Sequence, residues 1–108
     1  MQAGKHTVIR MARIYQVQTM GEADVRVALV PDRGQADLWV HRVDSWGLAR
    51  GDALWFITGA RHDATAWVYF CSIGMAQLQV CFVDTYGEAG WRDPQRARKG
   101  FFSRRGFG

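Results

Sequence analysis

The chain has 108 residues, of which 48% are hydrophobic and 22% charged; these proportions fit one small globular domain and exclude a wholly disordered chain. Its net charge of +4 is unevenly placed, because residues 92–108 carry +5 and residues 1–91 carry −1. No apolar run approaches the ~20 residues of a membrane-spanning helix, and residues 1–10 lack the apolar stretch of a secretory signal. We therefore expect a cytoplasmic protein with no membrane span.

Three regions follow one another along the chain. Residues 1–10 form an N-terminal extension to which we assign no structural role, and structure begins at Met11 with the phrase MARIYQV. Residues 11–91 contain a β-repeat domain. Residues 92–108 form a basic tail with no apolar periodicity, one proline and three glycines. This composition predicts a flexible segment, at least beyond Pro94.

A tetrad with a closing alanine recurs six times, at alanine spacings of 13, 13, 15, 12 and 13 residues. In most copies a glycine stands second, which predicts tight corners that use its positive φ. An extra Arg50–Asp52 stretch follows the third copy. The tetrads begin at Met20, Arg33, Trp46, Arg61, Ile73 and Tyr86.

Short β-branched and aromatic runs lie between the tetrads, which predicts strands. They span 13–18, 25–30, 38–43, 54–58, 66–71 and 78–83. The connections are too short for the helix of a βαβ crossover, so the predicted fold is all-β, with five or six short strands from a ~13-residue tandem repeat. Two layouts fit. One is an antiparallel meander, and the other is a compact coil in which each strand pairs with the one two repeats away. The identity of the repeats favours the coil.

Alternation along the strands assigns one face to the core. This face holds Val25, Val27, Leu29, Leu38, Val40, Leu54, Phe56, Ala66, Val68, Phe70, Leu78, Val80 and Phe82. The opposite face repeats a tryptophan at Trp39, Trp55 and Trp67. We expect this aromatic face to serve packing or self-association. A platform for stacking bases, peptides or sugars is the alternative interpretation.

Several polar residues could be mistaken for catalytic or metal-binding groups. Acids and amides recur at the corners, and we interpret them as turn caps that bond local backbone N–H groups: Glu22, Asp24, Gln35, Asp37, Asp63, Gln77 and Glu88. His6, His41 and His62 show no metal-ligand spacing. Cys71 and Cys81 are expected to be buried thiols. We therefore predict no catalytic residue, no metal and no cofactor.

The phrases QADLWV, DALWF and YGEAGW resemble the ADLxVYFV-type units of a family of small bacterial proteins, the septoil or 7(1) knot domain. The resemblance covers roughly residues 11–91. It implies a chain threaded into a seven-crossing torus knot, against the general rule that chains are unknotted. It implies no activity, substrate or catalytic residue. The chain departs from the family pattern in the Arg50–Asp52 insertion, in glycine for serine in most tetrads, and in the basic tail.

Three functional hypotheses remain. The first is a non-enzymatic structural or interaction module. The second is an accessory protein that binds RNA or single-stranded DNA through the basic tail, where arginines would neutralise phosphates and phenylalanines would stack on bases; its contacts would be Arg96, Arg98, Lys99, Phe101, Phe102, Arg104, Arg105 and Phe107. The same composition also suits an anionic membrane surface or a solubilising tail. The third is a small enzyme with a site in the irregular loop 46–52.

Overall fold

The computed structural model describes residues 11–105, so the predicted extension 1–10 and Phe107 lie outside the described residues. In this range the chain forms seven strands: β1 (Arg13–Gln16), β2 (Val25–Leu29), β3 (Leu38–Arg42), β4 (Leu54–Ile57), β5 (Ala66–Phe70), β6 (Leu78–Phe82) and β7 (Gly90–Trp91). The all-β fold and its six main strands are thus confirmed. The two-residue β7 was not predicted. No helix in this range is long and apolar enough to cross a membrane.

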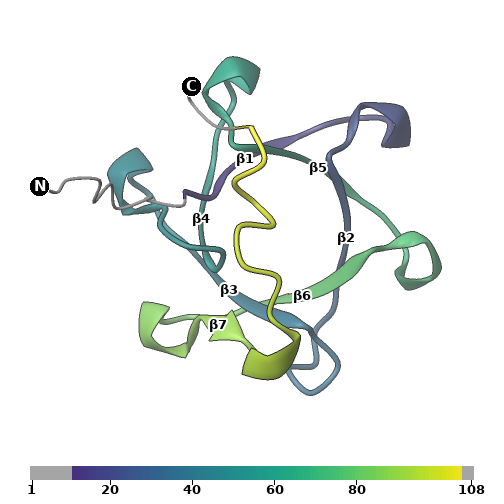
Figure 1. Ribbon diagram of the computed structural model, residues 1–108, viewed down its shortest axis with the longest axis vertical. Helices are drawn as coiled ribbons and strands as arrows, with labels where there is room; N and C mark the ends of the chain where they lie inside the picture. The colour runs from purple at the N-terminus through teal and green to yellow at the C-terminus, as the bar shows by residue number, and fades with distance from the viewer. Residues whose placement is uncertain (1–10, 106–108) are drawn as a thin grey trace, which may run out of the picture.

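The first six strands form one closed, parallel sheet around a central axis (Figure 1). Their order is β4-β1-β5-β2-β6-β3, and a further β3–β4 pairing closes the ring. β1 pairs with β5 from Ile14↔Ala66 onward, and β3 pairs with β6 from Leu38↔Val80 onward. Because every strand runs the same way, the barrel has one mouth at the strand starts and another at the strand ends.

The chain winds around this barrel rather than meandering, as the repeats indicated. Most strands lie two positions further round the ring of six than their predecessor, but β4 lies only one position beyond β3. Three steps that include this short one advance five positions, one less than a full circuit. The newly placed strand then falls beside the strand three places earlier. Pairing with the strand two repeats away is therefore wrong; the partners lie three and four strands apart, except at the β3–β4 closure. The torus knot that the resemblance implies stays a prediction.

Six arms project outward from the barrel, each formed by the connection that follows one of the strands β1–β6 (Figure 1). Five contain a 3₁₀ helix at the tetrad: η1 (Met20–Glu22), η2 (Trp46–Leu48), η3 (Arg61–Asp63), η4 (Ile73–Met75) and η5 (Tyr86–Glu88). The sixth, residues 31–37, has a turn there. Each 3₁₀ helix ends where the N–H of the tetrad alanine donates to the carbonyl of the tetrad's first residue.

The glycines of the tetrads do not use positive φ, contrary to the sequence-based expectation. Among the described glycines, positive φ is confined to Gly51, Gly90 and Gly100. The second residue of a 3₁₀ turn has ordinary right-handed geometry, which any L-residue can adopt. This explains why His62 occupies the same position in η3 without strain.

Inward-facing side chains of all six strands fill the barrel. The fully buried members include Ile14, Val25, Val27, Leu38, Val40, Trp55, Val68 and Val80. The assignment of Leu54 and Phe56 to the core was wrong, because Trp55 points inward and is 0% exposed. The same assignment was wrong for Leu29, which ends β2 and is 48% exposed. The core position falls an even number of residues after each tetrad alanine. The 15-residue spacing after Ala49 preserves this parity, which places Trp55 inside.

The polar residues at the strand starts are structural, but their bonds are not local. Asp24 Oδ2 accepts from the backbone N–H of Trp67, and Asp37 Oδ2 accepts from that of Gln79, both at 2.8 Å. Gln77 and Thr65 make the same contact to β2 and β1. Each side chain thus satisfies the N–H of the first or second residue of the adjacent parallel strand, which would otherwise lack a partner at the mouth.

The C-terminal segment, residues 92–105, crosses the mouth formed by the strand starts (Figure 1, yellow). It includes the 3₁₀ helix η6 (Pro94–Arg96), which Asp93 caps by accepting from the N–H of Gln95. Phe102 is 0% exposed and belongs to the same hydrophobic cluster as the barrel interior. The prediction of a flexible tail beyond Pro94 is therefore wrong for residues 95–105. Apolar burial of Phe102, for which the sequence offers no periodic pattern, orders them.

Candidate nucleic-acid interface

The C-terminal segment is fixed first by aromatic packing. The ring of Phe102 lies 4.9 Å from that of Trp55, centroid to centroid, and Phe101 packs edge-on against Phe102 at 5.4 Å. Trp55 in turn meets Phe82 at 6.0 Å. These separations and tilts are those of favourable aromatic pairs. Phe102 therefore closes the barrel interior at this mouth.

Buried polar groups fix the backbone of the segment on either side of Phe102. Asp52, which belongs to the inserted stretch, accepts from the backbone N–H of Gly100 at 3.0 Å and from Trp91 Nε1 at 3.1 Å. The Thr65 hydroxyl donates to the Phe102 carbonyl at 2.7 Å. The carbonyl of Thr65 accepts from the N–H of Arg105, also at 2.7 Å. The insertion thus supplies the anchor that holds the segment across the mouth.

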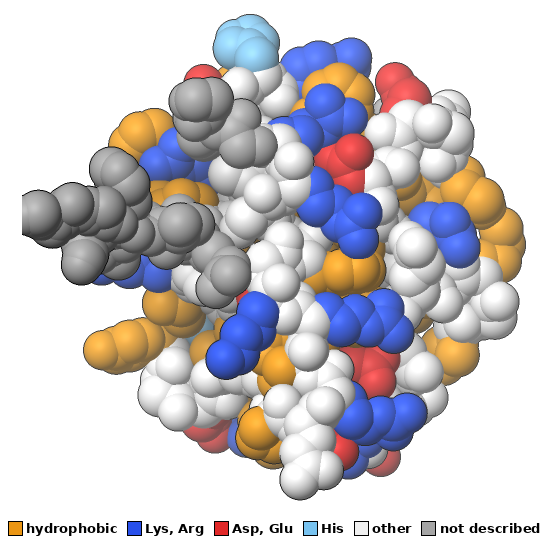
Figure 2. All heavy atoms as spheres, in the orientation of Figure 1, with side chains coloured by type: hydrophobic (Ala, Val, Ile, Leu, Met, Phe, Trp, Pro, Cys, Tyr) orange, Lys and Arg blue, Asp and Glu red, His pale blue; other side chains and the backbone are white. Residues whose placement is uncertain are grey.

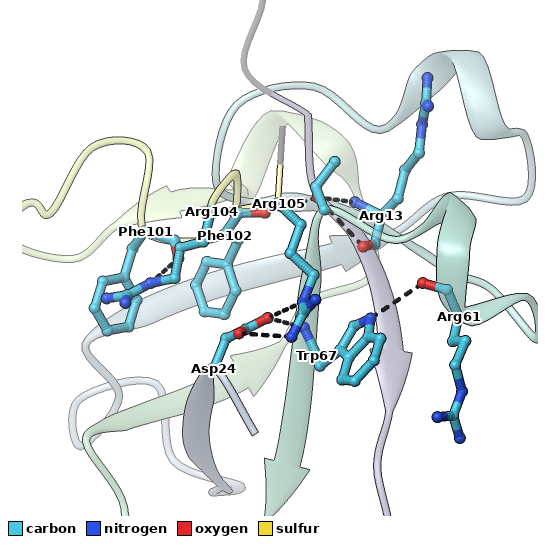
Figure 3. A network of polar contacts seen from close by, with 9 residues as sticks. Arg13, Asp24, Arg61, Trp67, Phe101, Phe102, Arg104 and Arg105 are labelled. Carbon is cyan, nitrogen blue, oxygen red and sulfur yellow. Dashed lines mark hydrogen bonds and ion pairs between the residues drawn. The ribbon is translucent and has the colours of Figure 1, made fainter. Parts of the chain in front are cut away.

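Arg105 ties the far end of the segment to the barrel (Figure 3). Its guanidinium binds both carboxylate oxygens of Asp24, at 2.7 and 3.2 Å. It also lies over the Trp67 ring at 3.6 Å. A two-point Arg–carboxylate contact backed by an aromatic face has little freedom to rearrange. Arg105 therefore serves the fold, and its charge is already paired.

Five other cations of the segment are exposed and have no ion pair, and one of them, Arg92, donates to the Ala36 carbonyl. Within residues 11–105 the ion pairs are Arg33–Glu88 and Arg105–Asp24. Arg96, Arg98, Lys99 and Arg104 are exposed. Figure 2 shows Lys and Arg side chains gathered along the band where the C-terminal segment crosses the mouth. We call these four residues the basic ridge. The hydrogen-bonded backbone beneath them and the buried Phe102 fix the positions from which these side chains extend.

Phe101 is the one phenylalanine of the described segment that reaches the surface. It is partly buried, with the guanidinium of Arg104 at 4.4 Å and that of Arg98 at 5.3 Å from its ring. Arg104 Nε also donates to the Phe101 carbonyl at 3.0 Å. Phe102 is unavailable for stacking on a base, so its predicted role as a contact is wrong. Base contact in this segment is therefore limited to the exposed edge of Phe101 and the planes of the arginines.

A small polar cleft of about 270 Å³ lies beside the ridge, between η6 and the barrel mouth. Arg92, Arg96 and Arg98 line it, together with Asp37 and Asp93. Both carboxylates are engaged with backbone N–H groups, of Gln79 and Gln95. Arg92 uses its Nε on the Ala36 carbonyl, at 2.7 Å. The remaining guanidinium donors can receive the oxygens of a phosphate.

The predicted aromatic face does not exist as a unit, because Trp55 lies in the core. Trp39 and Trp67 face outward and are partly buried. Each indole Nε1 donates to the carbonyl that opens the preceding tetrad: Trp39 to Arg33 at 2.9 Å, and Trp67 to Arg61 at 3.0 Å. The two indoles thus fill spaces between arms and stabilise the repeat.

The remaining candidates are dispersed. Cys71 and Cys81 are free thiols, the first partly buried and the second buried. The part of the chain that the structure describes contains no group of three or more His, Cys, Asp or Glu residues suited to a metal ion. Loop 46–52 contributes Leu48 and Arg50 to a groove of about 980 Å³ on the side of the barrel, with His41 also in its lining. Sequence reasoning located this loop as irregular but did not foresee the groove.

The shifted pKa values belong to residues of the arms and of β1. The contact with Arg33 lowers the pKa of Glu88, and the same contact raises the pKa of Arg33. The hydrogen bond to the Tyr15 hydroxyl raises the pKa of Arg61. Burial lowers the pKa of Arg13, whose guanidinium lies 3.4 Å from the Trp46 ring. All these arginines stay charged at neutral pH. Arg33 joins two arms, whereas Arg13 and Arg61 each join an arm to β1.

The fold thus defines a class: a closed barrel of six parallel strands, wound from a tandem repeat and bearing a basic segment across one mouth. The chain belongs to the 7(1) septoil knot domain family, whose model matches residues 11–92. The match ends where the C-terminal segment begins, so the basic ridge lies outside the matched region. No curated protein and no solved structure matches the chain.

Proposed function

We propose that this protein is a non-enzymatic interaction module that binds single-stranded nucleic acid through the basic ridge. The observation that carries the proposal is the exposure of Arg96, Arg98, Lys99 and Arg104, without ion pairs, on one ordered segment. Fixed cations bind a polyanion by releasing its counterions, and an ordered backbone loses less conformational entropy on binding than a flexible tail.

The contacts available at the ridge favour binding with little sequence preference. Arginine forks suit phosphate oxygens, and one phenylalanine edge suits stacking on any base. A cleft lined by Arg92, Arg96 and Arg98 lies alongside to receive a phosphate. We expect affinity to fall with added salt and to differ little between RNA and single-stranded DNA of mixed sequence.

The test is fluorescence anisotropy of labelled single-stranded RNA and DNA, titrated with the full chain at several salt concentrations. Deleting the segment would remove Phe102 and expose the core residue Trp55 on which it packs. Variants that change only charge are therefore the better probe. The variant R96Q/R98Q should weaken binding and reduce the slope of log K against log salt by about 1.4, at about 0.7 per phosphate contact on a single strand.

The matched control is R42Q/R50Q, which makes the same change in net charge at the side of the barrel. It should leave the salt slope nearly unchanged. Equal losses of affinity in the two double variants would show that binding depends only on net charge, and would contradict binding at the basic ridge. Absence of binding at low salt would remove the nucleic-acid proposal altogether.

A further inference from the structure

A tryptophan of the chain fills the space beside the arm at two of the six tetrads. After η1, η2 and η4 the same position holds Arg26, Asp52 and Gln79. Trp67 fills the space beside η3, and Trp39 fills the space beside the arm 31–37. In both, the tryptophan lies six residues after the first residue of the tetrad, whose carbonyl accepts the indole N–H. That first residue is an arginine, and its guanidinium lies 5.9 Å from the ring of Trp39 and 5.2 Å from that of Trp67.

The space beside η5 lacks such a filler. Six residues after Tyr86 stands Arg92. The chain has by then reversed at Gly90, so that β7 runs antiparallel to β3. Arg92 consequently donates to the Ala36 carbonyl at the mouth instead of packing beside η5. The sixth tetrad therefore repeats the geometry of the second and fourth without supplying the tryptophan that fills the space beside them.

The groove of about 980 Å³ is found at this place, between η5 and η2 at the left of Figure 1. Its floor includes His41 of β3, Leu54 of β4 and Val83, which directly follows β6. Its walls include Leu48 and Tyr86 from the two arms. Leu48 is 53% exposed and Tyr86 70% exposed. No hydrogen bond, ion pair or ring contact between η2 and η5 occurs among the described residues.

One backbone carbonyl of the groove has a counterpart in the two filled spaces, while Arg42, Asp44, Arg50 and Asp84 add charged side chains to the lining. The Tyr86 carbonyl is the counterpart of the Arg33 and Arg61 carbonyls, and it receives the N–H of Ala89 just as they receive the N–H of Ala36 and Ala64. In the filled spaces the same carbonyl also accepts an indole N–H. The Tyr86 ring stands where an arginine flanks the indole. His41 Nδ1 lies 3.1 Å from the Val83 carbonyl, which can only accept, so Nδ1 carries the proton.

We propose that the groove between η2 and η5 is a binding site for a small planar heteroaromatic molecule with a ring N–H, of indole size. The ring lies against the Tyr86 side chain and donates its N–H to the Tyr86 carbonyl. The proposal is independent of the basic ridge, since none of the ridge residues lines the groove.

The test is an NMR titration of the isotopically labelled full chain with indole and, separately, with N-methylindole. Indole should shift the His41 ring signals and the Leu48 and Leu54 methyl signals in a saturable way. N-methylindole has no N–H and should bind about fivefold more weakly, as expected for one lost hydrogen bond. Equal affinity for the two compounds, or absence of saturable shifts at these residues, would overturn the proposal.

Two exposed side chains at the first position of their tetrads provide matched variants. Tyr86→Ala should weaken indole binding about fivefold by removing the aromatic contact. Ile73→Ala on η4, away from the groove, should leave it unchanged; equal losses would contradict the site. A second copy of the chain could instead occupy the groove with its exposed Trp46. Sedimentation in the absence of indole tests this alternative, because it shows whether the chain dimerises. If the chain dimerises and indole dissociates the dimer, the small-molecule proposal fails.

Discussion

Phe102 combines two properties that rarely coincide at a chain end: it is fully buried, and it packs against the largest side chain of the core, Trp55. Replacing it by alanine removes this contact and leaves a cavity at the mouth. We predict that Phe102→Ala lowers the free energy of unfolding by about 3–5 kcal/mol, the usual range for a buried phenylalanine. Urea denaturation followed by tryptophan fluorescence measures this directly.

Phe101 provides the control for that substitution, since it is adjacent in sequence but only partly buried. Phe101→Ala should cost clearly less than Phe102→Ala, because part of its ring area is in water in the folded state. Comparable losses for the two variants, or a Phe102→Ala variant as stable as the parent, would show that the segment does not seal the core in solution.

The conformation of the arms predicts how glycine-to-alanine substitutions change stability. Gly74 lies in η4 with negative φ, and a Cβ added there meets no atom within 4 Å. Gly74→Ala should therefore stabilise the protein by about 0.4–1 kcal/mol, because alanine restricts the unfolded chain. Gly51 has a φ of +67°, so Gly51→Ala should instead destabilise, by about 1–2 kcal/mol. The unfolding temperatures of the two variants test this account. It would be contradicted if both temperatures rose or both fell relative to the parent.

The strands were predictable because alternation and the tetrads are local signals. The orientation of β4 was not, because the prediction aligned LWF with the LWV of β3 and ignored the parity counted from Ala49. The order of the C-terminal segment was also missed: one phenylalanine in a basic, glycine-containing stretch has no period to recognise. Its anchors, Asp52 and Thr65, lie 37 or more residues away in sequence, and only the winding brings them to the same mouth.

The exposed cations of the candidate site were predicted from the sequence, but the packing of the segment that carries them was not. The cations at positions 96, 98, 99 and 104 are exposed as expected. Arg105 and Phe102 are engaged with the barrel, because Asp24 and the core offer them better partners than solvent does. The groove beside η5 could not be foreseen, since it depends on the reversal of the chain at Gly90, which a sequence pattern does not reveal.

For the whole molecule, the winding predicts slow folding. The parallel pairings join residues far apart in sequence, as in Arg13↔Phe56 and Ile14↔Ala66, so loops must close before contacts stabilise them. We expect refolding in the millisecond-to-second range or slower, and slow unfolding as well, if most pairings form after the transition state. Stopped-flow fluorescence tests both rates. Refolding within microseconds, as for an isolated hairpin, would contradict this picture.

The two ends of the described chain meet at one mouth, where the Ser103 hydroxyl donates to the Met11 carbonyl at 2.7 Å. A mechanical load applied through residues 11 and 105 would therefore reach the contacts of this mouth before it reached any interior strand pair. The first rupture would lift Phe102 out of the barrel, and the remaining strands would then bear the tension without their plug. The first resistance to pulling is thus set by the C-terminal segment, and the sheet resists only after that segment has detached.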